Sequence, residues 1–593
     1  MGMAQTRLRI IDLSSFEMPI ANETGTVRVV INGELYGFEQ IRSNLEHRGH
    51  RFRTQCDSEI VVHLYEEYGE NCVEYLRGEF AFVLWDDTRK KLFAARDRFG
   101  IKPLFYAQIG NSLYLASEAK ALFAAGVPAA WDSETAFRNI FLCFDENSTH
   151  FRNIRQVPPG TALTADAGGV RRRRYWNLNY PNRREQKSSS SEQDSIAELQ
   201  RLLIECVRIR LRADVPVGCY LSGGLDSSSV LGIASGISAG PVSAFTVAFD
   251  HVDFDESAKA RIAAVHNNAP FTQVQVNETA CAECFEDSVW ASEGVHYNAH
   301  GAARYLLSRR VSEAGYKAVL AGEGADELFA GYDFAQGALA ASSNHRNVVQ
   351  LMVRVVKAAI GPHSPATRTI STASPWLARM CRVLAFPPPF MDALADKLGT
   401  VRGLLATDFA NEYQRRDPYA ELVALLEPRA NLRGREPVHQ LLYSWIRSLF
   451  LNYVLGAERL DMAHAVEVRL PFLDHKLFEF ARGLPPALLL RSGKRKFILR
   501  EAAKDFIPEA IYTGEKQPFF APPSTLRASS RLHELLQDYL RGEQFSRVPF
   551  FDARAVRAWL DRMATSDSSS RASMDPLVFM LASIGILQSR YRL

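Results

Sequence analysis

Short runs of alternating or β-branched apolar residues fill the first 125 residues, and they predict strands separated by turns and short helices. The predicted strands are 7–13, 27–31, 80–85, 92–95 and 112–115, the predicted helices are 38–46 and 60–68, and a closing β-segment covers 151–178. We expect the strand 27–31 to end at Asn32-Gly33-Glu34, which has the composition of a turn. This mixture predicts an antiparallel α+β sandwich.

A polar segment then divides the chain. Residues 180–194, YPNRREQKSSSSEQD, contain proline, serine and charge without periodicity. We interpret them as a linker between an N-terminal domain of residues 1–179 and a C-terminal domain of residues 195–593. The arginine run 171–174 has no interleaved aromatic residues, so we interpret it as a solvated strand edge and not as a nucleic-acid site.

The apolar period becomes helical from residue 195 onwards. Strand patterns at 215–221, 242–249 and 272–276 alternate with helix patterns at 225–235 and 256–267. This β-α-β-α-β order predicts a doubly wound parallel sheet, the α/β fold class. A further strand at 317–321 precedes long helical patterns, with a poorly patterned stretch at 335–445 and a loop at 361–374.

Composition narrows the functional classes. The chain has 593 residues, of which 47% are hydrophobic, and its net charge is +3, which gives no case for nucleic acid or an anionic membrane. No continuous apolar run reaches the roughly 18–20 residues of a membrane span, and no secretory signal is visible. The eight cysteines are scattered, which fits reduced thiols. We expect a cytoplasmic protein with small-molecule substrates, and we leave a homodimer open.

The strongest chemical signal is Leu221-Ser222-Gly223-Gly224-Leu225-Asp226-Ser227-Ser228, between a predicted strand and a predicted helix. Two glycines allow a tight turn, and the helix N-terminus offers free N–H groups to an anion. The segment lacks the lysine of the Walker pattern. We therefore expect a pyrophosphate-binding loop, in which Asp226 holds Mg²⁺.

Two further segments have charged residues at the ends of predicted elements, where they could contact a metal ion or phosphates. Ala321-Gly322-Glu323-Gly324-Ala325-Asp326-Glu327 follows a predicted strand, and its three carboxylates would repel one another without a cation or substrate. Asp326 is our second predicted Mg²⁺ ligand. The segment Lys494-Arg495-Lys496-Phe497-Ile498-Leu499-Arg500 begins a predicted helix, and one of its cations could face phosphates.

In this order, the three segments resemble the glutamine-dependent asparagine synthetases. SGGLDSS resembles the pyrophosphate loop of ATP pyrophosphatases, and GEGADELFAGY (322–332), MAHAVEVRLPFLD (462–474) and KQPF (516–519) resemble later family motifs. Upstream, NGELY (32–36), DSE (57–59), GEFAF (78–82) and RDRFGIKPL (96–104) are similar to the family's class II glutaminase domain. The resemblance runs from Arg7 to about residue 520.

The resemblance implies specific roles. The C-terminal domain would bind ATP and aspartate, form β-aspartyl-AMP and pyrophosphate, and let ammonia displace AMP. Asp226 and Asp326 would hold Mg²⁺, Lys496 would face the phosphates, and Glu323 would accept a proton from ammonia. The remaining implied positions are Tyr220, Val247, Ala321 and Gly322 for the nucleotide base and ribose, Arg7 and Asp57 for glutamine's charged groups, Asn32 and Gly33 for the oxyanion hole, and Glu34 within the same glutamine pocket.

The beginning of the chain departs from the family. The family's glutaminase uses an N-terminal Cys, whereas residue 2 here is Gly2 and no cysteine precedes Cys56. We therefore expect that the first strands and the nucleophile are missing through a mis-set start codon or a truncated gene model. The alternative is a genuinely short chain, which would be a synthetase that uses free ammonia or another amine. The chain as given should not hydrolyse glutamine.

Other features keep alternatives open. The family commonly has Asp-Arg-Met-Ser where this chain has Glu458-Arg459-Leu460-Asp461, which puts strict aspartate specificity in doubt. One alternative is a relative that forms an amide or lactam on another carboxylate in secondary metabolism. Another is a non-catalytic nucleotide-binding protein. We interpret Cys281 and Cys284 as core residues, and His296 and His300 as pocket walls and not as zinc ligands.

Overall fold

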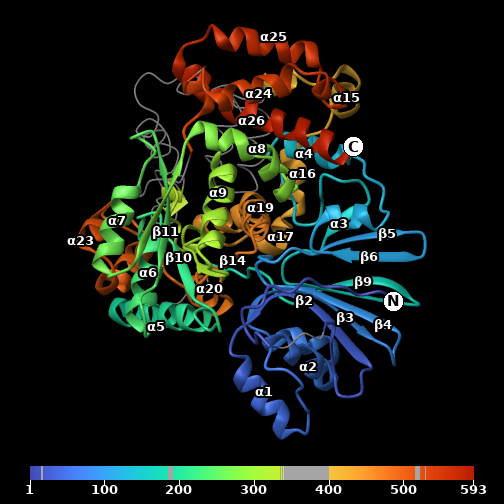
Figure 1. Ribbon diagram of the computed structural model, residues 1–593, viewed down its shortest axis with the longest axis vertical. Coiled ribbons are helices and arrows are strands. Elements are labelled where there is room, and N and C mark those ends of the chain that lie inside the picture. The colour runs from blue at the N-terminus through green and yellow to red at the C-terminus, as the bar shows by residue number, and fades with distance from the viewer. Residues whose placement is uncertain are drawn as a thin grey trace.

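The computed structural model of the protein describes residues 1–14, 18–183, 191–333, 335–336, 338–339, 400–514, 521–527 and 529–593. An N-terminal domain with antiparallel sheets precedes a C-terminal domain built on a parallel sheet, as Figure 1 shows. The predicted loop 361–374 and the segment 516–519 lie outside the described residues, as do residues 340–399 of the poorly patterned stretch.

The larger N-terminal sheet is antiparallel, and in the described chain its strand order is β1-β2-β3-β4-β8-β9. Its strands are β1 (Ile20–Ala21), β2 (Val27–Leu35), β3 (Gly78–Asp86), β4 (Lys91–Arg96), β8 (Thr161–Asp166) and β9 (Gly169–Arg174). A smaller antiparallel sheet has the order β6-β5-β7, with β5 (Phe105–Ile109), β6 (Ser112–Ala116) and β7 (Ile154–Gln156). The predicted solvated edge is confirmed, since the four arginines of β9 are exposed.

Side chains of β3 point alternately to the two faces of the sheet, and each face packs against a different layer of this domain. Phe80, Phe82 and Leu84 face a core shared with α1 (Phe38–His47) and α2 (Ile60–Tyr68). The intervening residues of the strand face a second core shared with the smaller sheet. Period-two burial on both faces therefore produces a helix–sheet–sheet sandwich, which confirms the predicted α+β class.

Two strand predictions in this domain are wrong. Residues 7–13 form no strand, because Ile10 and Ile11 are both buried and break the alternation, and Asp12 has a left-handed φ of 57°. The strand predicted at 27–31 continues to Leu35, since Asn32 and Gly33 pair with β3 and do not turn.

The C-terminal domain is organised around a parallel sheet of strand order β12-β11-β10-β13-β14. The strands are β10 (Val217–Tyr220), β11 (Ala244–Phe249), β12 (Phe271–Val276), β13 (Ala318–Leu320) and β14 (Glu467–Arg469). The crossover helices are α6 (Leu225–Ile237), α7 (Ser257–His266), α8 (Glu278–Ser292) and α9 (His300–Glu313). Every predicted strand and helix of this unit is present to within a few residues, so the α/β class is confirmed.

The first helix of this domain begins earlier than predicted. α5 (Glu192–Arg210) starts inside the segment that we interpreted as a linker. Ser191 accepts a hydrogen bond from Asp194 N at 3.1 Å, and Asp194 accepts one from Ser191 N at 3.2 Å. This reciprocal capping box fixes the helix start three residues before the apolar period begins.

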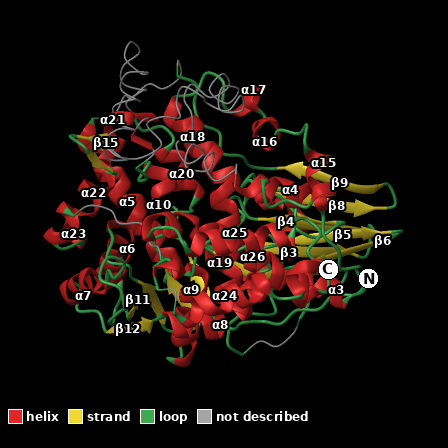
Figure 2. Cartoon of the chain, turned by 90° about the horizontal axis from the view of Figure 1, so that it is seen from above, coloured by secondary structure: helices red, strands yellow, loops and turns green. Residues whose placement is uncertain are grey.

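Further helices pack around the parallel sheet, and Figure 2 shows α19 (Leu451–Met462) between this sheet and the N-terminal strands. Helix α26 (Ser568–Tyr591) has the length and apolar composition of a membrane span, but 72% of its most apolar stretch is buried in the protein, so we interpret it as a core helix. The remaining α-helices and β-strands of the described chain are α3 (Ala119–Ala124), α4 (Ser133–Ile140), α10 (Ala325–Phe329), α15 (Thr407–Tyr413), α16 (Pro418–Leu425), α17 (Pro428–Asn431), α18 (Pro437–Trp445), α20 (His475–Ala481), α21 (Pro486–Leu489), β15 (Leu490–Arg491), β16 (Lys494–Arg495), α22 (Phe497–Ala503), α23 (Glu509–Thr513), α24 (Arg531–Arg541) and α25 (Ala553–Ala564).

Candidate functional site

Two loops meet at the carboxyl edge of the parallel sheet, because the strands that precede them are neighbours. β10 leads into residues 221–224 and α6, and β13 leads into residues 321–324 and α10. β11 and β12 lie on one side of β10, whereas β13 and β14 lie on the other. In open α/β sheets, ligands bind at such a switch point.

The two loops contact each other directly. A Cβ atom added to Gly322 would lie 2.7 Å from Ser227 N, so glycine permits this close approach. Ser227 Oγ accepts a hydrogen bond from Ser222 N at 3.1 Å, which closes the turn of residues 221–224 over the start of α6. Gly223 has a φ of 77° in this turn, and Gly224 caps the helix. The predicted anion-binding residues therefore form one compact turn at a helix N-terminus.

Lys496 connects the two loops electrostatically. Its Nζ lies 2.6 Å from a carboxylate oxygen of Asp226 and 2.6 Å from one of Asp326. Burial alone would lower the pKa of this amine, but the two carboxylates outweigh burial and the pKa of Lys496 is raised. The structure thus brings together the three charged residues that the sequence singled out in separate segments.

This charge cluster has the features of a site for a metal ion and phosphates. A Cβ atom added to Gly331 would lie 1.9 Å from both Asp326 Oδ1 and Lys496 Cε, so the backbone is pressed against the cluster. Two carboxylates beside an anion-binding loop are the oxygen ligands that Mg²⁺ takes together with phosphate. The residues present therefore fit a magnesium–pyrophosphate group.

A second cluster surrounds Glu323. The carboxylate of Glu323 pairs with the Arg304 guanidinium, whose other nitrogen lies 2.7 Å from Asp461 Oδ2. Asp461 is fully buried and also accepts hydrogen bonds from Ser308 and, at 3.3 Å, from the Tyr220 hydroxyl. Burial raises the pKa of Asp461, and Arg304 opposes that shift.

The sequence reasoning missed Arg304, and it noted Asp461 only as a departure from the family pattern. Of the other predicted positions, Val247 is buried in β11 and Ala321 donates its backbone N–H to Arg469 O at 3.1 Å. His296 is buried against Ser292, and Cys281 and Cys284 are buried in α8, as predicted. The only signal for Arg304 was its position early in α9, one turn after His300.

The residues predicted to bind glutamine gather around the end of β2. Arg7 donates hydrogen bonds to Ile11 O at 2.7 Å and to Asp12 O at 3.1 Å, and its guanidinium lies 3.4 Å from Cys56 Sγ. Asp57 accepts a hydrogen bond from Leu35 N at 2.8 Å.

Asn32, Gly33 and Glu34 directly precede Leu35 in the same strand. Burial and the neighbouring Asp57 raise the pKa of Glu34, and Arg469 opposes this. Arg469 lies 3.0 Å from Glu34 and comes from β14, so the N-terminal cluster is bonded directly to the parallel sheet.

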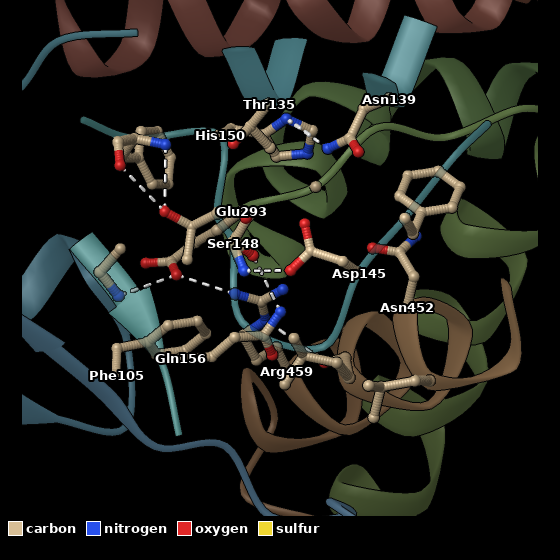
Figure 3. Close-up of a pocket in the computed structure, with 17 residues that line it drawn as sticks. Phe105, Thr135, Asn139, Asp145, Ser148, His150, Gln156, Glu293, Asn452 and Arg459 are labelled. Atoms are coloured by element: carbon tan, nitrogen blue, oxygen red, sulfur yellow. Dashed lines mark hydrogen bonds and ion pairs between the residues drawn. The ribbon is translucent and has the colours of Figure 1, made fainter. Parts of the chain in front are cut away.

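A small cavity of about 40 Å³ lies where the two domains meet, and the predictions missed it (Figure 3). Glu293 and Arg459 form an ion pair of 2.8 Å in its wall, and His150 and Asp145 line it from the N-terminal side. None of the predicted site residues lines this cavity. Its volume suits one or two molecules the size of water or ammonia.

Comparison with known proteins matches both parts of the chain to known families. The family model described as asparagine synthase matches residues 198–584, and the glutamine amidotransferase domain model matches residues 1–176. Amidase chry2 of Gibberella zeae is 32% identical over 94% of this chain and 86% of the relative, and amidase chyE of Penicillium rubens is 32% identical over 95% and 87%. Asparagine synthetase [glutamine-hydrolyzing] 1 of Bacillus subtilis is 26% identical over 100% of this chain and 90% of the relative.

Proposed function

Because this chain belongs to the asparagine synthase family, we propose that it activates a carboxylate with ATP and converts it into an amide through an acyl-adenylate. The substrate carboxylate attacks the α-phosphorus of ATP and releases pyrophosphate. Ammonia then attacks the acyl carbon and releases AMP. The observation that carries this proposal is the buried Lys496, which Asp226 and Asp326 hold at adjacent strand ends.

The charged residues at the two strand ends would share the work of the first step. Asp226 and Asp326 would hold Mg²⁺, which neutralises charge on the departing pyrophosphate. Lys496, freed from its carboxylates by that ion, would donate hydrogen bonds to the phosphates as charge develops. The backbone N–H groups of residues 221–224 would receive the pyrophosphate.

Glu323 would serve the second step. Ammonia must lose a proton as it forms the amide bond, and a carboxylate at the edge of the sheet can accept it. Arg304 holds Glu323 in place, so we assign Arg304 as a positioning residue. Tyr220, Val247, Ala321 and Gly322 would frame the nucleotide base and ribose from β10, β11 and the second loop.

Aspartate is the first candidate for the carboxylate substrate, which would make the product asparagine. Ammonia is the proposed nitrogen donor, although Arg7, Glu34 and Asp57 gather at the end of β2, where the family resemblance puts a glutamine pocket beside the predicted oxyanion-hole residues. Within the described residues, the thiol beside Arg7 is that of Cys56, whose pKa burial and Asp57 raise to about 12. A thiol in that state is a poor nucleophile, so we expect this chain to use added ammonium. We propose a cytoplasmic location.

A second candidate is amide formation on a different carboxylate. Asp461 supports it, because a buried carboxylate occupies one side of Arg304 where the family commonly has serine. A substrate carboxylate at this position would meet a guanidinium that is already neutralised and a like charge beside it. The 32% identity to two proteins named amidases supports the same candidate.

One assay tests the proposal and separates the candidates. Pyrophosphate release would be followed with ATP, Mg²⁺ and ammonium, with aspartate or with a panel of other carboxylates. Aspartate-dependent release that yields asparagine supports the first candidate, and release with another carboxylate supports the second. No release with any carboxylate, in protein that still binds ATP, would overturn catalysis and favour a non-catalytic nucleotide-binding protein.

A substitution tests the role of Asp461. Asp461→Ser restores the residue that the family commonly has and frees one side of Arg304 for a substrate. If aspartate is excluded by the buried carboxylate, this variant should release pyrophosphate with aspartate at least about ten-fold faster than the parent chain. Asp461→Asn, which removes the charge but keeps the volume, is the control for charge. An unchanged aspartate rate in both variants would contradict this reading of Asp461.

A further inference from the structure

A group of histidines and glutamates in the N-terminal domain belongs to neither proposed site. It lies around α1 and α2, which are at the lower end of the molecule in Figure 1, away from the parallel sheet. One member follows α1, two are on α2, and one is in the turn between β1 and β2. We name this group the His–Glu cluster: Glu23, His50, His63 and Glu66.

The cluster has the dimensions of a four-ligand metal site. One donor atom from each residue lies within 4.8 Å of all the others. The Nδ1 of His50 is 3.7 Å from Glu23 and 3.6 Å from Glu66, and the Nδ1 of His63 is 3.6 Å from Glu23 and 3.2 Å from Glu66. Ligand bonds of about 2.0–2.2 Å to a tetrahedral zinc ion place neighbouring donor atoms about 3.3–3.6 Å apart.

Outer groups orient the donor atoms. The Nε2 of His50 lies 3.1 Å from Glu67 Oε1, and the Nε2 of His63 faces Glu59 Oε1 at 3.7 Å. Each imidazole therefore points Nδ1 inwards and has a carboxylate behind it, the arrangement that supports histidine ligands of metals. The side-chain amide of Asn22 donates to Glu66 Oε1 at 2.6 Å, which fixes that carboxylate from outside the cluster.

The local charge favours a divalent cation. Four glutamates surround the two imidazoles, and Arg48 pairs with one of them, Glu67, at 2.8 Å. His63 is fully buried, and its hydrogen bonds to Glu59 and Glu66 outweigh burial and raise its pKa to about 9, so a bound ion would displace a proton from this ring. Two imidazoles and two carboxylates suit zinc better than magnesium or calcium, which take oxygen ligands.

We propose that the His–Glu cluster binds one Zn²⁺ as a structural ion. The four protein ligands leave no open position, which is typical of structural and not catalytic zinc. The ion would tie the β1–β2 turn and the segment after α1 to helix α2. The helical layer packs on the face of the larger sheet that carries Phe80, Phe82 and Leu84, so the ion would hold that layer together.

Zinc content and stability of the full chain test the proposal. Bound metal would first be removed from the protein with a chelator. The protein would then be titrated with Zn²⁺ in the presence of excess Mg²⁺, and zinc content and thermal unfolding would be measured. We expect one zinc per chain and a higher melting temperature with zinc than with chelator. Cobalt substitution should give the visible absorption of a tetrahedral site.

Matched variants make the result specific. His50→Gln and Glu66→Gln each remove one ligand from a partly exposed position, and each should weaken zinc binding about ten-fold or more. His47→Gln removes an exposed histidine of α1 outside the cluster and should bind zinc like the parent chain. The proposal is overturned if the parent chain binds no zinc, or if both ligand variants bind it as tightly as His47→Gln. Circular dichroism would establish that each variant is folded.

Discussion

A single lysine decides the electrostatics of the proposed ATP site. Asp226 and Asp326 come from loops one hundred residues apart, and the parallel pairing of β10 and β13 forces them together. Without a cation between them they would repel, so the buried Lys496 stabilises the fold of both loops in the absence of Mg²⁺. Once Mg²⁺ is bound, the same ammonium group would donate hydrogen bonds to the phosphates of ATP.

Replacing this lysine should therefore have two separable effects. In Lys496→Met, the rate of pyrophosphate release should fall by about 10²–10³-fold, the cost of losing one donor aimed at developing charge. The melting temperature should also fall, and Mg²⁺ alone should restore it, because the metal replaces the missing cation. Assays with and without Mg²⁺ measure both effects.

Lys494→Met is the matched control, since this lysine is exposed and two residues away. It should change neither the rate nor the response to Mg²⁺. A Lys496→Met protein whose melting temperature ignores Mg²⁺ would show that Asp226 and Asp326 do not form a metal site.

At the scale of elements, the parallel sheet could be predicted and the start of the chain could not. The strands and helices from 215 to 276 have regular periods that report burial directly. In residues 7–13 polar and apolar residue types alternate, but burial does not, because Ile10 and Ile11 are both buried. Arg7 bonds to the backbone oxygens of its own segment, and Asp12 N donates to Asp214 Oδ2 at 2.8 Å, a contact across 202 residues. No local pattern carries that information.

The same limit applied to the candidate site. Glycine-rich and acidic segments are recognisable in the sequence, so Asp226, Glu323 and Asp326 could be predicted as members of the candidate site. Arg304 reaches Asp461 across 157 residues, and its position one turn after His300 does not by itself distinguish it from a surface arginine. Pairings of this kind depend on how the helices pack.

The extension of β2 through Gly33 gives a prediction at this scale. Gly33 has a φ of 126°, and a Cβ atom there would lie 1.8 Å from Glu79 O in the neighbouring strand. Gly33→Ala should therefore push β2 and β3 apart and lower the free energy of unfolding by roughly 3 kcal/mol, from backbone strain and overpacking together. Denaturant unfolding measures this loss.

Gly456→Ala is the control for a glycine substitution without steric conflict. A Cβ atom at Gly456 in α19 would meet nothing within 4 Å, so alanine should stabilise the helix by about 1 kcal/mol. If both variants unfold at the parent's denaturant concentration, the close contact of β2 with β3 at Gly33 is wrong.

At the scale of the whole molecule, buried neutral histidines should make the protein sensitive to mild acid. Burial lowers the pKa of His439 to about 4, whereas an unfolded chain titrates near 6.5. Between these values the unfolded state binds more protons, so the free energy of unfolding falls as the pH is lowered from about 6.5 towards 4.

Unfolding experiments across this pH range measure the effect of that histidine. At pH 5, His439 should cost on the order of 1–2 kcal/mol relative to pH 7, and His439→Gln should remove that part of the pH dependence. His266→Gln, at an exposed position of α7, should leave the pH dependence as it is. An identical slope in the parent and His439→Gln would contradict the buried neutral state.

Some ionic contacts between the two domains are buried, and we expect these to determine how the whole chain unfolds. Arg210 of α5 pairs with Glu79 of β3 at 2.9 Å and with Asp474 at 3.1 Å, and all three side chains are almost completely buried. Removing one partner of a buried pair leaves charge without compensation and costs about 3–5 kcal/mol. Arg210→Met should therefore lower the melting temperature and separate the unfolding of the two domains into two calorimetric transitions.

Arg212 provides the matched comparison, because it also joins the domains but at the surface. It lies 3.1 Å from Glu39, with both side chains substantially exposed, and exposed pairs contribute about 0–1 kcal/mol. Arg212→Met should keep one transition near the parent's temperature. If Arg210→Met behaves in the same way, the two domains are held together by their apolar contacts and not by the buried ion pairs.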